Sequence, residues 1–452
     1  MDAYYGAQTQ RATENFRVSS LRLPGSFIRA QAIIKRAAAC VHMASGALTE
    51  SIGKAIIDAA DEILDGQHMH QFVIDVFQAG AGTSQNMNIN EVLANRANEI
   101  LGGERGRYDL VHPNDHVNMG QSTNDTIHAA IHIAAYSEIS RRLFPTLIEL
   151  QKALRDKSIE FDHVLKSGRT HLQDAVPMRL GQEFGGYAAM MEKAQDRIMH
   201  ASGALLELPL GGTAVGTGLN TVPGYRMAVI KQINELTGFK FKPAANFFEA
   251  MQNLDAVVEL AGALRVLVTS LGKIADDLRL LSSGPRTGMA EIKLPAVQPG
   301  SSIMPGKINP VLPEMLNMVC YHAMGCDMAI VQAANAGQLE LNVMMPVVAY
   351  NLLSEIEILA GGINSFRERC VIGITADKKR CRSYAERSAA LATALSPVIG
   401  YHKAAELARE ALEKDVLIRD LVRSKKLLDE AGIKSVLDIY EMAREPEDSE
   451  ES

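Results

Sequence analysis

The residues best suited to chemistry in this sequence lie in one short run, Gly300–Pro310. It holds two serine hydroxyls, one lysine ammonium and one asparagine carboxamide, on Ser301, Ser302, Lys307 and Asn309. Apolar side chains do not recur there with a helical or a strand period, and the glycines and prolines favour a mobile loop. Such a loop suits a dicarboxylate, because lysine and asparagine can hold a carboxylate while a serine reaches the reacting carbon. The alternative is a surface loop whose polar side chains are merely solvated.

Two further segments combine glycine with short polar side chains. In residues 80–86, glycines permit tight turns and Thr83 offers a hydroxyl donor, although loops of this kind are common. Residues 120–125 open a predicted helix. There Ser122 or Thr123 is either a simple N-cap or a donor to a carboxylate, since the free N–H groups of a helix N-terminus also attract anions.

A histidine marks the fourth polar segment, residues 168–175. Thr170 and His171 stand there between Arg169 and Asp174. A lone histidine is more often a structural hydrogen-bonding group than a catalyst. The neighbouring hydroxyl, guanidinium and carboxylate nevertheless favour a functional site. We expect this segment to be a loop.

Long helices would position these four segments. Leu254–Leu281 carries apolar side chains at three- and four-residue steps for about eight turns without a proline, which is typical of a helical bundle. Met315–Ala334 is apolar on more than one face, so it needs neighbours on all sides, and an oligomer would supply them. We find no internal repeat and no strong strand pattern. Shorter helices are expected at Arg29–Ser45, Ser51–Leu64, Asn88–Leu101, Ala404–Leu412 and Val416–Leu428.

The composition limits the classes of protein to consider. Of 452 residues, 47% are hydrophobic but only 5% aromatic, so the cores must be aliphatic, as in helix-on-helix packing. A net charge of −7 argues against nucleic acid as a partner. The absence of a signal-peptide pattern and of about 18 consecutive uncharged apolar residues predicts a cytoplasmic protein with no membrane partner. Five cysteines without a CxxC pair favour reduced thiols, and we expect no metal site.

All four polar segments, in this order, resemble the signature of the fumarase/aspartase superfamily, and the resemblance runs from Asp2 to about Leu428. Relatives usually carry a short acidic stretch before this start. The resemblance implies an all-α fold whose long central helices form a twenty-helix core in a homotetramer. Each active site would draw on three chains, bind a small dicarboxylate and need no cofactor.

The same resemblance, with the composition, predicts three domains. We expect an N-terminal lyase domain at residues 1–120 and a central helical bundle with the signature loop at residues 121–375. A small C-terminal domain would occupy residues 376–452. Its last residues, Glu445–Ser452, are acidic and lack apolar side chains, so we expect a disordered tail.

The resemblance also implies roles for individual residues. Ser301 resembles the base that removes the C3 proton of the substrate, and Met304 resembles a residue at the substrate. Lys307 and Asn309 resemble the clamp on one substrate carboxylate. The other carboxylate takes up charge as the aci-carboxylate forms, and its donors would be Thr83, Ser122, Thr123 and Ser302.

A second group of residues would surround the leaving group or lie apart from it. His171 would pair with Glu314 as in relatives; otherwise Glu314 only opens the helix after Pro313. A secondary dicarboxylate site, described in some fumarases, would comprise His112, Asn114 and Asp115. The residues around the leaving group would be Asn124, Thr170 and His171.

Several other assignments remain open. Argininosuccinate and adenylosuccinate lyases share the Ser-Ser-x-Met-Pro-x-Lys skeleton, although Gly306 before Lys307-Ile308-Asn309 fits fumarases and aspartases better. The intact catalytic residues disfavour a crystallin-like structural protein. The Ala-Ser-Gly tripeptide from which aromatic amino-acid ammonia-lyases form their cofactor occurs at 44–46 and 201–203, without that family's glycine-rich setting. A helical scaffold would not need four such polar segments.

The sequence favours aspartase over fumarase within this superfamily. Ala81, Thr123 and Leu339 stand where fumarases usually have serine, serine and phenylalanine. A lost hydroxyl at Ala81 should harm hydration more than amine elimination. Against this, Gly212 has the fumarase-like form, and Met345 fits neither enzyme. We therefore expect reversible deamination of L-aspartate to fumarate and ammonia, with class II fumarate hydratase as the alternative.

Overall fold

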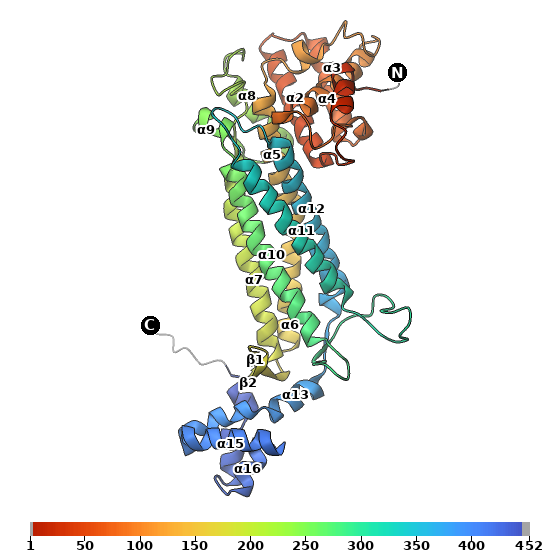
Figure 1. Ribbon diagram of the computed structural model, residues 1–452. Coiled ribbons are helices and arrows are strands. Elements are labelled where there is room, and N and C mark those ends of the chain that lie inside the picture. Colours follow the sequence, from red (N-terminus) through yellow and green to blue (C-terminus); the bar gives the residue numbers. More distant parts are fainter. Residues whose placement is uncertain (1–2, 445–452) are drawn as a thin grey trace. The chain divides into compact units, whose positions relative to one another are not determined.

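The computed structural model describes residues 3–444, and these are mostly α-helical (Figure 1). The predicted all-α fold is therefore confirmed. The chain divides into two compact units. Unit 1 comprises Met1–Thr146, Ala194–Thr269 and Val319–Gly361, and unit 2 comprises Leu147–Lys193, Ser270–Met318 and Gly362–Ser452. The three domains expected from the sequence stay a prediction.

Helices of 6 to 20 residues lie wholly within unit 1 (Figure 1). α2 and α3 pack against each other, and both carry buried alanines such as Ala37 and Ala59. On α4 the buried Glu91 accepts the backbone N–H groups of Gly6 and Thr9 at 2.9 and 3.0 Å, which caps the first turn of α1. The helices are α1 (Ala7–Asn15), α2 (Gly25–Ala44), α3 (Glu50–Leu64), α4 (Thr83–Ile100), α5 (Thr123–Glu138), α8 (Tyr225–Thr237) and α9 (Phe247–Gln252).

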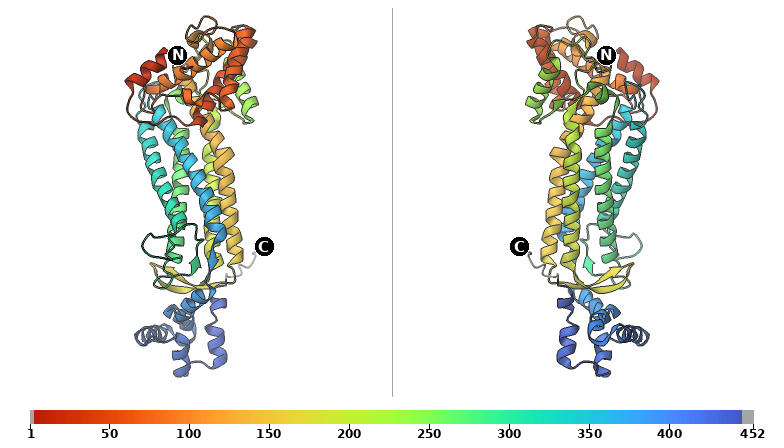
Figure 2. Two further views of the ribbon diagram at one scale, coloured as in Figure 1. Left: turned by 90° about the vertical axis from the view of Figure 1, so that its right-hand side faces the viewer. Right: turned by 90° about the vertical axis from the view of Figure 1, so that its left-hand side faces the viewer.

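Five of the described helices contribute residues to both units, and within each unit their parts lie side by side (Figure 2). In α10, Leu260, Leu264, Leu271 and Leu278 recur on one stripe and are fully buried, as the apolar period predicted. In α11, by contrast, one face of large apolar side chains is exposed. The five helices are α6 (Phe144–Glu160), α7 (Leu180–Ser202), α10 (Asp255–Leu281), α11 (Val311–Ala334) and α12 (Met345–Arg369).

One helix is long and apolar enough to cross a membrane by length and composition. It spans Met345–Gly373, and 61% of its most apolar window is buried inside the protein. A core helix of a bundle passes the same test, because neighbouring helices cover its apolar faces. The helix is therefore weak evidence for a membrane span.

A β-hairpin in unit 2 is the main departure from the sequence expectation. β1 (Leu165–Thr170) and β2 (Gln173–Arg179) pair antiparallel, so residues 168–175 form a hairpin and not the expected loop. The register shifts between Ser167 and Arg169, and this irregularity breaks the alternation by which a strand is recognised. Two further pairs have two residues per strand: β3 (Glu207–Leu208) with β4 (Lys242–Pro243), and β5 (Ile292–Lys293) with β6 (Thr375–Ala376).

The C-terminal part of unit 2 has its own small aliphatic core, which includes Leu395, Leu407, Val422 and Leu437. The helix expected at Ala404–Leu412 lies inside α15. The helix expected at Val416–Leu428 is shorter, because Lys426 turns the backbone into the left-handed region after α16. The tail expected at Glu445–Ser452 lies outside the described residues. The helices are α13 (Lys378–Arg387), α14 (Ser396–Ile399), α15 (Tyr401–Lys414), α16 (Ile418–Ser424), α17 (Glu430–Val436) and α18 (Ile439–Met442).

Candidate active site

Thr83 stands at the first position of α4, after a tight turn at Gly80–Gly82. Ala81 and Gly82 both adopt left-handed backbone conformations, with φ of 59° and 84°. A Cβ on Gly82 would meet side-chain carbons of Ile127 on α5 at 3.2 Å, so this glycine permits a close approach of the two elements. The expected loop to Asn86 is too long, because the helix already begins at Thr83. The Thr83 hydroxyl is exposed at this corner.

Ser122 is the N-cap of α5, as one of the two sequence interpretations predicted. Its hydroxyl accepts the N–H of Asn124 at 3.2 Å, and its own N–H donates to Asp125 Oδ1 at 3.0 Å, which completes a capping box. Asp125 is fully buried, and its other oxygen accepts the N–H groups of Gly211 at 2.9 Å and Thr213 at 3.1 Å. Burial raises the pKa of this carboxyl to about 6, although the backbone donors oppose the shift.

This arrangement leaves Thr123 and Asn124 at the open end of α5. Asn124 Nδ2 donates to the carbonyl of Ala214 at 2.8 Å, which fixes its carboxamide. Because a helix N-terminus has free N–H groups and a positive partial charge, the end of α5 can hold a carboxylate. Unit 1 thus brings together Thr83, Ser122, Thr123 and Asn124, since α4 and α5 contact each other there.

His171 and Leu172 form the two-residue turn of the β1–β2 hairpin. Both have left-handed backbone conformations, with φ of 57° and 59°, and both are exposed. Such turns favour glycine and asparagine, so each of these residues costs about 1 kcal/mol of strain. The hairpin therefore presents His171 at its tip, directly after Thr170 at the end of β1.

Buried ion pairs anchor β1 of this hairpin, and sequence reasoning missed them. Glu291 has no exposed surface and accepts two hydrogen bonds from the Arg169 guanidinium, at 3.0 and 2.9 Å. Lys166, also buried, lies 3.6 Å from Glu291 and donates to Glu183 at 2.9 Å. Arg169 is thus a structural partner of Glu291. Two basic residues three positions apart, Lys166 and Arg169, were the sequence signal for this anchor.

The signature loop folds back on its own backbone. The N–H of Gly300 donates to the carbonyl of Lys307 at 2.9 Å, and Asn309 Nδ2 donates to the carbonyl of Gly300 at 2.7 Å. A Cβ on Gly300 would lie 2.3 Å from the Lys307 carbonyl oxygen, so only glycine fits this neck. Ser301 Oγ accepts the N–H groups of Ile303 at 3.2 Å and Met304 at 3.0 Å.

Two N–H donors on Ser301 Oγ favour negative charge on that oxygen, which suits a base. The side chains of Ser302, Met304 and Lys307 are exposed. Glu314 lies in the first turn of α11, where its N–H donates to the carbonyl of Pro310 at 3.1 Å. Within the described part of this one chain, His171 and Glu314 do not contact each other by a hydrogen bond or ion pair. Their pairing stays a prediction.

The residues expected at a secondary site belong to a short π-helical turn, Pro113–Val117: Asn114 and Asp115 lie inside it, and His112 is its N-cap. His112 Nδ1 accepts the N–H of Asp115 at 3.2 Å and also lies 3.1 Å from its carboxylate. Asn114 and Asp115 are exposed. The ring of His112 is thus used locally as a cap, and a dicarboxylate site here stays a prediction.

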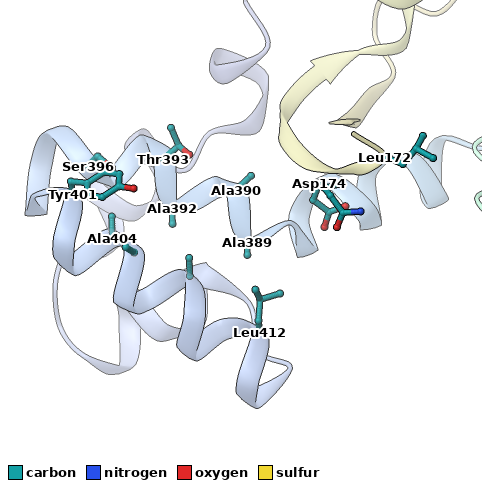
Figure 3. A pocket seen from close by; sticks show the side chains of 13 residues that line it. Leu172, Asp174, Ala389, Ala390, Ala392, Thr393, Ser396, Tyr401, Ala404 and Leu412 are labelled. Atoms are coloured by element: carbon teal, nitrogen blue, oxygen red, sulfur yellow. The ribbon is translucent and has the colours of Figure 1, made fainter. Parts of the chain in front are cut away.

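A cavity of about 620 Å³ opens beside the hairpin tip, and Figure 3 shows the side chains that line it. Leu172, Gln173 and Asp174 face alanines of residues 389–408 across it, with hydroxyls from Thr393, Ser396 and Tyr401. The residues that line this cavity in the described chain include no cation. A carboxylate of Asp174 and small apolar groups cannot neutralise a dicarboxylate, so this cavity alone is not its site.

Comparisons with known proteins agree with these features. A family model described as "Lyase" matches residues 1–325, and one described as "Fumarase C C-terminus" matches residues 391–444. An aspartate ammonia-lyase of Bacillus subtilis (strain 168) is 47% identical over 98% of this chain and 93% of its own. A class II fumarate hydratase of Nitrosomonas europaea is 50% identical over 92% of this chain and 90% of its own.

A solved structure gives the same result. A fumarate lyase:delta crystallin of Brucella melitensis superposes with a TM-score of 0.94 at 47% identity, covering 98% of this chain and 97% of that one. The chain is therefore a lyase of the fumarase/aspartase superfamily.

Proposed function

We propose that this protein is an aspartate ammonia-lyase, which converts L-aspartate to fumarate and ammonia. Ala81 carries the proposal. It is buried in the turn before α4, and its N–H donates to the carbonyl of Val343 at 2.8 Å. Its methyl group thus adds no hydroxyl beside Thr83, where a serine could help to place a water. The lack of that donor should harm hydration more than amine elimination.

Local packing weakens the strongest argument for fumarase. Aspartases often carry alanine where this chain has Gly212. A Cβ on Gly212 would lie 3.0 Å from both the sulfur of Met251 and the carbonyl oxygen of Pro209. Because this crowding alone favours glycine, Gly212 says little about the substrate. Class II fumarate hydratase remains the second candidate, since relatives of both activities share nearly equal identity with this chain.

In the proposed mechanism Ser301 removes a proton from C3 of aspartate. The electron pair of the broken C–H bond moves into the adjacent carboxylate and gives an aci-carboxylate. Ser122, Thr123 and the N-terminus of α5 would stabilise this group, with Thr83 and Ser302 as further donors, because donors placed in advance act most strongly where charge develops. Lys307 and Asn309 would hold the other carboxylate.

The second step would release the amine. As the C2–N bond breaks, its electron pair leaves with the ammonium nitrogen as ammonia, and the pair on the aci-carboxylate forms the double bond of fumarate. Asn124, Thr170 and His171 would surround this leaving group, with Glu314 pairing with His171. The reaction needs no cofactor and no metal, and we propose that it takes place in the cytoplasm.

We also propose a homotetramer with shared active sites. Met318, Tyr321 and Met328 form one face of α11 and are 63%, 68% and 59% exposed in the single chain. Exposed apolar side chains at this helical spacing favour burial against another copy of the bundle. The site residues also fall into two sets, one in each unit, and sharing between subunits would let the sets meet.

Product analysis with two substrates tests the proposed function. Purified enzyme incubated with L-aspartate should form fumarate and ammonia in equal amounts, and L-malate should give fumarate far more slowly. Formation of fumarate from malate, with no ammonia from aspartate, would overturn the proposal in favour of fumarase. An Ala81→Ser variant sharpens the test, because it should raise the rate with malate relative to aspartate.

A further inference from the structure

A buried network of carboxamides lies beneath Thr123 in unit 1. Its centre is Asn118, which precedes α5. Asn118 Oδ1 lies 2.9 Å from Lys35 Nζ on α2 and 3.2 Å from both Asn86 Nδ2 and Asn90 Nδ2 on α4. Lys35 and Asn86 are each 1% exposed, and Asn90 has no exposed surface. Two helices distant in sequence from Asn118, α2 and α4, thus place three donors around one oxygen.

The chemistry of the end groups determines the direction of every bond in this network. Asn118 Nδ2 lies 3.1 Å from the backbone carbonyl of Gln121, which can only accept. Burial lowers the pKa of Lys35 to about 7, and both its ammonium and its neutral amine carry hydrogens that they can donate. Asn118 must therefore present its NH₂ to Gln121 and its oxygen to Lys35. Because that oxygen also faces Asn86 and Asn90, both must present their NH₂ groups to it.

This direction extends to Thr123. The Asn86 NH₂ group has two hydrogens, and its nitrogen also lies 3.1 Å from Thr123 Oγ1. Asn86 therefore donates to the Thr123 hydroxyl, and that hydroxyl is left with a single hydrogen to donate. Within the described residues no hydrogen bond from the Thr123 hydroxyl to an acceptor is formed. Thr123 is half-buried at the first position of α5, beside the N–H groups that can hold an anion.

We propose that Asn86 is a positioning residue that holds the Thr123 hydroxyl as a hydrogen-bond donor to a substrate carboxylate. This proposal rests on the proposed function, in which Thr123 binds the carboxylate that takes up charge. A hydroxyl free to rotate could equally turn its lone pairs to the substrate, which would repel it. The bond from Asn86 occupies one of the two lone pairs and disfavours turning the hydrogen toward Asn86, which favours a hydrogen directed at the substrate, and an accepted bond also strengthens the donated one.

A double-mutant cycle tests this coupling. Asn86→Ala should lower kcat about 10- to 100-fold with a smaller change in KM, because the donor matters most in the transition state. In a Thr123→Val background, which lacks the hydroxyl but keeps the shape, Asn86→Ala should lower kcat no more than about threefold further. Equal effects of Asn86→Ala in both backgrounds, or no effect of either single change, would overturn the proposal.

A neighbouring residue supplies the matched control. Asn90 lies one turn from Asn86 and donates to the same oxygen of Asn118, but in the described part of the chain it forms no hydrogen bond with Thr123. Asn90→Ala should therefore cost as much thermal stability as Asn86→Ala and much less kcat. If both variants lost kcat equally, Asn86 would only stabilise the fold, and the proposed positioning of Thr123 would be wrong.

A second variant and a second substrate complete the experiment. If Asn86→Ala does not fold, Asn86→Asp has nearly the same shape but only acceptors, so it should turn the Thr123 hydroxyl inward and lower kcat at least as far. The cycle is run with both L-aspartate and L-malate. If malate proves to be the substrate, the proposed function fails, while coupling between Asn86 and Thr123 would still be measured with malate.

Discussion

The signature loop and the N-terminus of α5 both carry candidate substrate ligands, but they are held in opposite ways. Residues 300–310 are held by bonds of the loop's own backbone, its side chains and the neck at Gly300, and Ser302 and Lys307 point into solvent. The α5 segment rests on buried side chains, with Asp125 on one side and the network of Asn118 on the other. A loop can reorganise around a substrate, whereas a buried network cannot.

This difference matches the work each region would do. A base must approach and leave the reacting carbon, so a loop with few outside contacts suits Ser301. Donors that stabilise developing charge act best when they need no rearrangement, so a buried support suits Ser122 and Thr123. Proton removal would thus depend on a mobile half of the site, the signature loop, and charge stabilisation on a rigid half, the N-terminus of α5. It predicts that substitutions in the loop affect catalysis alone, and that substitutions beneath α5 affect catalysis and stability together.

The largest effect is expected in the loop. Ser301→Ala should lower kcat by about three orders of magnitude or more, because it removes the proposed base. Thermal unfolding should be unchanged, since the hydroxyl accepts bonds only within the loop. Steady-state kinetics and a melting curve on the same preparation check both parts. Near-normal turnover would remove Ser301 from the mechanism.

An intermediate effect on both properties is expected beneath α5. Asp125→Ala removes the acceptor for the N–H groups of Ser122, Gly211 and Thr213, which should cost about 2 kcal/mol of unfolding free energy. The same change should lower kcat about 10- to 100-fold, because the donors at the end of α5 lose their position. Denaturant unfolding and kinetics measure the two losses. A variant that loses stability but keeps its kcat would show that the α5 segment is not part of the rigid half.

The smallest effect, on stability alone, is expected for a buried carboxylate that lacks the backbone hydrogen bonds that Asp125 accepts. Glu355 on α12 is fully buried, and neither of its oxygens has a hydrogen-bond partner among the described residues. Burial raises its pKa to about 9, and the nearby carboxylate of Asp327 adds to the shift. The folded protein therefore keeps a proton that the unfolded chain loses above its ordinary pKa of 4.5, so stability falls as the pH rises from there to about 9.

Glu355→Gln should remove this fall and raise the unfolding free energy at pH 8 by about 2 kcal/mol, with kcat unchanged. Glu357→Gln, on the same helix but exposed, is the control and should change neither. Denaturant unfolding across this pH range gives the comparison. If the unfolding free energy of Glu355→Gln fell with pH as in the wild type, Glu355 would not be the source of this pH dependence. The contrast between the hydrogen-bonded Asp125 and the unbonded Glu355 would then fail.

Sequence reasoning reached some of these features and not others for physical reasons. The helical period of Leu254–Leu281 predicted α10, since a stripe of buried leucines repeats locally. The site loops were recognisable because their residues are contiguous. The β1–β2 hairpin was missed, because its strands are polar and carry a register shift.

The supports of the site were also missed. Lys35 and Asn118 meet across 83 positions of sequence, and Asn86 and Thr123 across 37. A contact of that range leaves no period or spacing in the sequence. The cluster of asparagines in residues 86–90 was the one visible hint, and in the structure it faces inward from α4.

The central claim is that the mobile loop of one subunit works with the rigid α5 segment of another. Mixed tetramers test it most directly. Ser301→Ala and the double variant Ser122→Ala/Thr123→Val, each nearly inactive, are dissociated together and reassembled in equal amounts. If each site takes these residues from different chains, about one quarter of the sites would hold both unaltered, and activity should return to about one quarter of wild type. No recovery in mixed tetramers whose formation is confirmed would contradict the claim.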